Sequence, residues 1–144
     1  MSDETPGPPL ALFALAAVYL FSLVLAVSSY GNPIPFLGGC YTGRAGECLV
    51  FADSLICLYL ILGILKRQRL TLWLLIAYNL LDICNACLNL ALLSPGQYAL
   101  LAGAPVSASE LRLETFAAAL ILMLLNVYVL NKRRHFNNVS PYLF

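Results

Sequence analysis

The sequence has little charge. Only 10% of its 144 residues are Asp, Glu, Lys or Arg, whereas 61% are hydrophobic. Soluble domains carry about 25% charged residues, so this composition, with a mean hydropathy of +0.85, excludes an ordinary soluble domain. The formal net charge is only +1, and the basic residues form two short clusters rather than an extended surface. A nucleic-acid partner is therefore not expected, and the lipid bilayer is the first partner that the sequence predicts.

The sequence also lacks the motifs of the common enzyme classes. It contains one histidine, no glycine-rich nucleotide loop, no Ser/His/Asp order and no zinc-type ligand spacing. We therefore expect no cofactor and no bound metal, and the residues do not favour an enzyme.

Four apolar segments are each long enough to form a helix across a hydrocarbon core of about 30 Å. They cover approximately residues 10–29, 48–65, 70–93 and 110–130. The N-terminus lacks the basic start of a secretory signal, so the first segment is expected to remain as a span. Ser107 and Glu110 have the spacing of a capping box at the start of the fourth segment. The sequence thus predicts one all-α domain over residues 1–144, an integral membrane four-helix bundle in up-down-up-down order.

The basic residues predict the orientation of this bundle. Six of the eight Lys and Arg follow the second or the fourth segment: Lys66, Arg67, Arg69, Lys132, Arg133 and Arg134. Because cytoplasmic segments are enriched in Lys and Arg, we expect these clusters, both termini and a tail over 131–144 to be cytoplasmic. The connections 31–47 and 94–110 are then expected outside.

The two halves of the chain have a weak similarity. Each consists of a span, a 17-residue connection, a second span and a basic cluster. An internal duplication is one interpretation, and selection for basic cytoplasmic ends is another. The short turn "KRQR" also predicts that the second and third spans pack as antiparallel neighbours.

A polar stripe interrupts the third span in "YNLLDICNACLNL". At 100° per residue, one helix face carries Asn79, Asp82, Asn85 and Asn89. A charge near the middle of a bilayer, where Asp82 is expected, costs about 3 kcal/mol, so this face must contact protein or water. With Asn126 of the fourth span, these residues form the candidate polar site.

Three interpretations of the stripe are open. In the first, its side chains form interhelical hydrogen bonds, and the candidate partners are Asn126, Tyr128, Tyr59, and Ser22 or Tyr19. In the second, Asp82 is an ion or proton site, and in the third the stripe is a binding face for a larger membrane partner. Asp53 of the second span is expected about one turn below the outer surface, where it reaches water or Arg112.

The cysteines suggest two further features. Cys40 and Cys48 share the first outer connection, where an oxidising compartment would favour a disulfide between them. Cys84 and Cys87 form a Cys-x-x-Cys in the third span. This layout resembles that of the quinone-linked thiol oxidoreductases, namely the vitamin K epoxide reductase and disulfide-bond-formation families. In the epoxide reductase pattern, however, the membrane cysteine pair lies on the fourth span, whereas here it lies on the third. The resemblance covers these four positions and implies a membrane thiol oxidoreductase. Such a cysteine pair can also bind a soft metal ion, so a carrier of soft metal ions is another hypothesis.

Three functions follow as hypotheses. The small extramembrane mass favours an assembly or accessory subunit, which associates with copies of itself as a homo-oligomer or with other membrane subunits. Asp82 favours a small oligomeric channel or an ion- or proton-coupled transporter. The four cysteines favour the thiol oxidoreductase.

Overall fold

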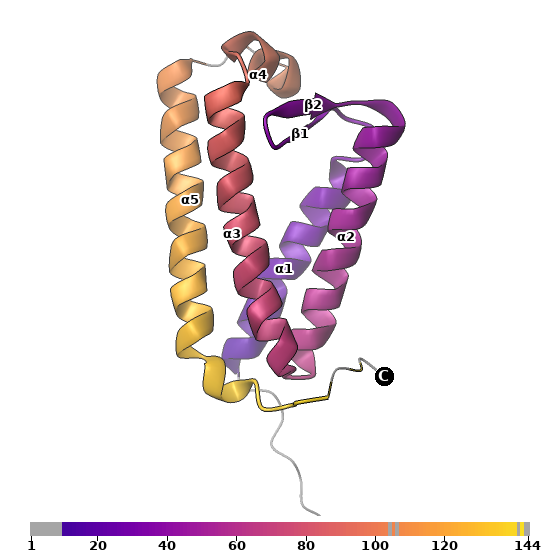
Figure 1. Cartoon of the computed structure of the whole chain (residues 1–144), viewed down its shortest axis with the longest axis vertical. Coiled ribbons are helices and arrows are strands. Elements are labelled where there is room, and N and C mark those ends of the chain that lie inside the picture. The colour runs from indigo at the N-terminus through magenta and orange to yellow at the C-terminus, as the bar shows by residue number, and fades with distance from the viewer. Residues whose placement is uncertain (1–9, 104, 106, 141, 143–144) are drawn as a thin grey trace, which may run out of the picture.

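The computed structural model describes residues 10–103, 105, 107–140 and 142. Helices dominate this part of the chain (Figure 1). Four of them, α1, α2, α3 and α5, are long and apolar enough to cross a membrane, as the sequence predicted. In chain order the elements are α1 (Leu10–Ser28), β1 (Ile34–Phe36), β2 (Gly39–Tyr41), α2 (Gly43–Leu65), α3 (Arg69–Leu92), α4 (Pro95–Ala102), α5 (Ala108–Asn131) and the 3-10 turn η1 (Arg133–His135).

The first turn of α2 lies earlier than predicted. Thr42 is extended and Gly43 has a φ of +58°, so the helix begins at Gly43 rather than near residue 48. Asp53 therefore lies ten residues into α2, about 15 Å along the axis at helical rise. The helix thus extends five residues beyond the predicted start of the span, while the depth of Asp53 below the outer surface stays a prediction.

The predicted cap of the last long helix is confirmed. The Ser107 hydroxyl accepts a hydrogen bond from the Glu110 amide, and the Glu110 carboxylate accepts one from the Ser107 amide, each at 3.2 Å. Ser94 and Gln97 form a second capping box at the start of α4. These caps satisfy amide groups that the first turn of a helix leaves free.

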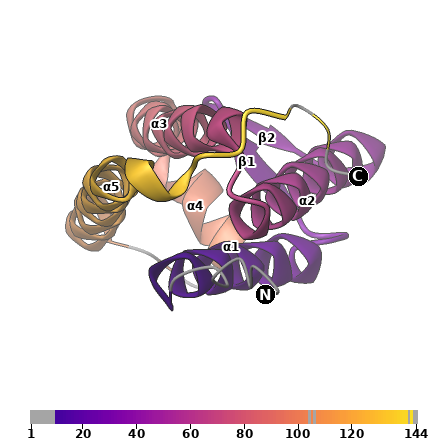
Figure 2. The same ribbon diagram turned by 90° about the horizontal axis from the view of Figure 1, so that it is seen from below.

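The long helices pack as two pairs that correspond to the two halves of the chain. The first pair is α1 with α2, and the second pair is α3 with α5. The pairs converge at one end and separate toward the other, where β1 and β2 lie between them (Figure 1). We call the first end the turn end, because it holds the α2–α3 turn, and the other the hairpin end. Figure 2, seen from below, shows α1 and α2 side by side along one edge.

The packing of α2 against α3 is less extensive than the sequence predicted. The two helices approach closely near their connecting turn, where a Cβ added to Gly63 would overlap the side chain of Thr71. Toward the hairpin end they diverge, because β1 and β2 are inserted between the pairs. A short turn fixes the distance between two helices only at the end where they are joined.

The apolar core lies in the turn-end half of the bundle. All four long helices and the C-terminal segment contribute fully or largely buried side chains, among them Leu15, Leu60, Leu75, Val129 and Phe136. This core joins the two pairs where they converge.

A short β-hairpin occupies the first connection. Strands β1 and β2 are antiparallel, with Ile34 opposite Tyr41 and Phe36 opposite Gly39. Leu37 and Gly38 form its turn with φ angles of +46° and +81°. Positive φ at both central residues is typical of the two-residue turns that suit the twist of a hairpin.

The C-terminal segment crosses the turn end and is held there. Gln68 pairs with Asn138 in an isolated β-bridge, and the Arg69 amide donates a hydrogen bond of 2.8 Å to the Asn138 carbonyl. The fully buried Gln68 side chain donates to the Tyr142 carbonyl, also at 2.8 Å. The predicted tail over 131–144 is thus held to the bundle by the buried Phe136 and by backbone hydrogen bonds of Asn138, Ser140 and Tyr142.

Candidate functional site

The polar stripe of α3 enters three different environments. Asn79 lies in the bundle interior, Asp82 borders a cavity, and Asn85 and Asn89 lie against the hairpin. Their common helix face therefore does not give them a common role.

Asn79 connects three helices by hydrogen bonds. The Tyr19 hydroxyl of α1 donates to Asn79 Oδ1, and Asn79 Nδ2 donates to Asn126 Oδ1 of α5, each at 2.8 Å. Tyr19 and Asn79 are both 1% exposed. Of the partners predicted for the stripe, Tyr19 and Asn126 are therefore confirmed, whereas the hydroxyls of Ser22 and Tyr128 donate to backbone carbonyls of α1 instead. Among the described residues, no buried side-chain nitrogen or oxygen lacks a hydrogen-bond partner, so the Tyr19–Asn79–Asn126 hydrogen bonds join the helices without leaving a buried polar group unsatisfied.

Asn85 and Asn89 hold the hairpin turn. The amides of Leu37 and Gly38 donate hydrogen bonds of 2.7 Å to Asn85 Oδ1 and Asn89 Oδ1, respectively. Asn89 Nδ2 donates in addition to the Pro35 carbonyl at 3.2 Å. Two asparagines from the second half of the chain thus position a loop from the first half.

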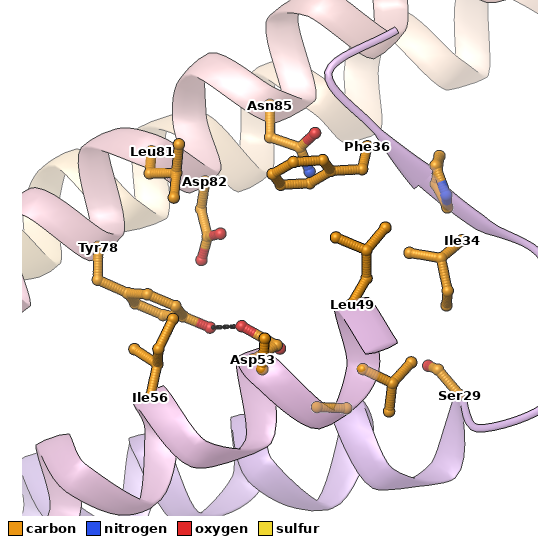
Figure 3. Close-up of a pocket in the computed structure, with 14 residues that line it drawn as sticks. Ser29, Ile34, Phe36, Leu49, Asp53, Ile56, Tyr78, Leu81, Asp82 and Asn85 are labelled. Atoms are coloured by element: carbon orange, nitrogen blue, oxygen red, sulfur yellow. Dashed lines mark hydrogen bonds between the residues drawn. The ribbon is translucent and has the colours of Figure 1, made fainter. Parts of the chain in front are cut away.

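Asp82 borders a cavity of about 340 Å³ between the two helix pairs (Figure 3). Ile34, Pro35 and Phe36 of the hairpin line its side toward the hairpin end. Most of the other lining side chains are apolar and come from α2 and α3: Leu49, Val50, Ala52, Ile56 and Leu81. The polar groups of the cavity therefore lie in mainly apolar surroundings.

A second carboxyl group faces Asp82 from the opposite wall. Asp53 projects from α2 and Asp82 from α3 into the same space (Figure 3). The Tyr78 hydroxyl donates a hydrogen bond of 2.7 Å to Asp53 Oδ1. The buried Cys57 Sγ lies 3.4 Å from the same hydroxyl and forms a second hydrogen bond with it. Asp53 is therefore bonded to Tyr78 rather than to Arg112.

Asp82 has a different environment from Asp53. No described residue donates a hydrogen bond to its carboxyl group, whose main electrostatic neighbour is Asp53. An ionised carboxylate is costly in apolar surroundings unless a counter-charge or hydrogen bonds compensate it. Two facing carboxyl groups can meet this requirement by holding a proton or by sharing a bound cation.

Sequence reasoning did not assign Asp53, Tyr78 or Cys57 to this site, although a signal for them was present. Asp53 and Cys57 are four residues apart on α2, and Tyr78 and Asp82 are four residues apart on α3. Residues at this spacing share a helix face, so each helix presents two polar groups on one stripe. The tight turn between these helices makes the two stripes candidates for contact.

The cysteine predictions have a different outcome. All five cysteines are free, so the predicted Cys40–Cys48 disulfide is wrong. Cys40 lies in β2 opposite Pro35, whereas Cys48 lies on α2, which already begins at Gly43. Strand pairing and the asparagines of α3 hold the loop instead. Cys84 and Cys87 are exposed, and neither lines the cavity.

In the described part of the chain, no three His, Cys, Asp or Glu side chains are grouped so that they could hold a metal ion. In comparisons with known proteins, no family model, curated protein or solved structure matches this chain.

Proposed function

We propose that this protein is a multi-pass membrane protein whose four spans alternate in direction, with both termini on the cytoplasmic side. Four helices of sufficient length and apolar character support the spans. The turn end carries both basic clusters, from Lys66 to Arg69 and from Lys132 to Arg134. Because cytoplasmic loops are enriched in Lys and Arg, the turn end is then cytoplasmic and the hairpin end is outside.

Within this frame, we propose that the cavity binds a small cation, and that the protein is an ion- or proton-coupled transporter. The observation that carries the proposal is the pair of carboxyl groups, Asp53 and Asp82, on opposite walls of one cavity. Asp82 receives no hydrogen bond from the described chain, so its charge needs a proton or an external cation. Ionisable groups within spanning helices commonly mark such sites.

The arrangement of the helices supports transport rather than static binding. Each carboxyl group belongs to a different closely packed pair, Asp53 to the first and Asp82 to the second. Transporters commonly move one such unit against another around a site between them. Cation binding across the gap would bring the pairs together, and its release would let them separate.

The test is a comparison of wild type with Asp82→Asn, which keeps the size of the side chain but removes its charge. Purified protein in detergent is titrated with sodium, potassium or methylammonium chloride, with N-methylglucamine chloride keeping the ionic strength constant. A ligand at 100 times its Kd stabilises the folded state by about 2.7 kcal/mol, so Tm should rise with the bound cation. We expect this rise in wild type and its loss in Asp82→Asn and Asp53→Asn.

Proteoliposomes then test transport. A pH-sensitive dye inside the vesicles reports proton movement when the selected cation is added outside. Glu114→Gln is the matched control, because Glu114 is an exposed carboxylate in the first turns of α5, outside the cavity. If both cavity variants respond to cations and conduct protons as wild type and the control do, the proposal is wrong.

The assembly role predicted from the sequence stays a prediction, because lipid and a partner protein would cover the apolar faces of the spans equally well. The thiol oxidoreductase also stays a prediction. Its four cysteines lie on the hairpin, on α2 and on the exposed side of α3.

A further inference from the structure

A second cavity, of about 360 Å³, lies at the turn end between α3, α5 and the C-terminal segment. Arg69, Arg133 and Arg134 line it together with Trp73. Phe136 and Val139 of the C-terminal segment form one wall, and the bridge between Gln68 and Asn138 holds this wall against the bundle. The cavity is thus formed by residues from distant parts of the sequence; Arg69 and Arg133, for example, are more than 60 residues apart.

The cavity has a polar rim and an apolar base. Arg69 is the first residue of α3, while Arg133 and Arg134 follow the last residue of α5, so all three lie at helix ends. Leu72, Trp73 and Leu130 lie within the helices, one turn nearer to the middle of the bundle. A molecule with a charged head and apolar chains fits this division.

The charge of the rim favours an anionic ligand. Among the described residues, no carboxylate forms an ion pair with Arg69, Arg133 or Arg134. The described acidic residues, Glu47, Asp53, Asp82, Glu110 and Glu114, lie in the middle of the bundle or toward the hairpin end. The N-terminal end of α3 adds the positive end of its helix dipole.

We propose that this cavity binds the phosphate-bearing headgroup of an anionic phospholipid, with Arg69, Arg133 and Arg134 on the phosphate and Trp73 beside the upper acyl chain. Guanidinium groups bind phosphate oxygens in a bidentate geometry, which suits three arginines around one headgroup. Basic pockets between spanning helices on the cytoplasmic side are a common form of lipid site. Tryptophan is enriched at the same depth, between headgroups and chains.

Trp73 provides the measurement, because it is the single tryptophan of the chain and is 59% exposed. Bromine atoms on acyl chains quench tryptophan fluorescence at short range. The protein is placed in nanodiscs of phosphatidylcholine with a minor fraction of phosphatidylglycerol, and either lipid carries the bromines. Quenching by bromines on phosphatidylcholine tests whether Trp73 lies in lipid at all. Excess quenching by bromines on phosphatidylglycerol, at equal bromine content, reports enrichment of the anionic lipid at the site.

We expect this enrichment in wild type and its decline as salt increases. Each arginine near a membrane surface contributes about fivefold to binding of an anionic lipid, so Arg133→Gln with Arg134→Gln should lower the enrichment by roughly tenfold or more. Lysine at both positions should restore most of it. The control is Arg44→Gln with Arg112→Gln, which removes the same charge at the hairpin end and should leave the enrichment unchanged.

Two outcomes overturn the proposal. One is equal loss of enrichment in the control and in the Arg133/Arg134 variant, which indicates a general attraction rather than this cavity. The other is loss of enrichment when inorganic phosphate replaces chloride at equal ionic strength, which indicates a site for free phosphate. Neither outcome depends on Asp53 or Asp82, so cation binding is tested separately.

Discussion

The side-chain oxygen of Asn85 accepts a hydrogen bond of 2.7 Å from the amide of Leu37, 48 residues earlier in the chain. Leucine is an unusual residue at a φ of +46°, which L-residues other than glycine, asparagine and aspartate rarely adopt. The neighbouring bond from Gly38 to Asn89 holds the next residue of the turn in the same way. The two asparagines therefore fix a strained turn, and the strand that leads into it, β1, lines the Asp53–Asp82 cavity as a lid at the hairpin end.

Asn85→Ala should loosen this turn. It leaves the Leu37 amide without its partner, a loss of about 1 kcal/mol or more. Hydrogen exchange at Leu37 should therefore become faster, on the order of tenfold. Asn137→Ala, at an exposed asparagine of the turn end, is the control and should leave that exchange unchanged. Unchanged protection of Leu37 in Asn85→Ala would show that the hydrogen bond does not hold the turn.

Leu37→Asn should stabilise the protein. A leucine in the left-handed region costs roughly 1–2 kcal/mol, and asparagine tolerates this conformation better. The leucine side chain is 43% exposed, so its replacement loses only part of its burial. Unfolding in mixed micelles should show a gain of about 1 kcal/mol. Leu37→Val should change stability in the opposite direction, because a β-branched residue fits a positive φ worst.

The sequence predicted the helices better than their contacts. Span length and apolar character depend on local composition, so the four long helices could be located from residues alone. The roles of Asn79, Asp82 and Asn85 could not be separated in this way, because residues on one face of a helix can contact three different elements. The hairpin that distinguishes them depends on Leu37, whose positive φ is contrary to its local preference.

Gly63→Ala should destabilise the bundle. The added Cβ would overlap the Thr71 side chain, which is fully buried in the narrow contact between α2 and α3. Overpacking of this kind costs roughly 1–3 kcal/mol, and here it should appear as a lower Tm. Gly96→Ala in α4 is the control, because its Cβ would approach only Ser94 Oγ, at 4.0 Å. Equal stability of the two variants would contradict the close approach of α2 and α3.

The effects of Tyr19→Phe and Asn79→Leu on the free energy of unfolding should not be additive. The Tyr19 hydroxyl and the Asn79 side chain are hydrogen-bonded, so either change alone leaves a buried partner without its bond. A double-mutant cycle of unfolding free energies should give a coupling of about 1 kcal/mol, within the range for hydrogen bonds between spanning helices. A coupling near zero would indicate that water or another group replaces the missing partner.

Gln68→Ala should release the C-terminal segment. Gln68 Nε2 donates to the carbonyls of Ser140 and Tyr142, and its Oε1 accepts from the Thr71 hydroxyl. Without these bonds, the Asn138 amide, which donates to the Arg67 carbonyl, should exchange faster by roughly tenfold. Gln97→Ala removes the glutamine of the α4 capping box at the hairpin end and should not affect Asn138.

The position of the hairpin in the chain has a consequence for biosynthesis. Strands β1 and β2 are synthesised between α1 and α2, but the side chains that fix their turn, Asn85 and Asn89, belong to α3. While only the first two spans have been made, the turn lacks the bonds that hold Leu37 and Gly38. We therefore expect this lid to be fixed only after α3 has been made. A truncated product that ends after α2 would carry Asp53 without a lid above it.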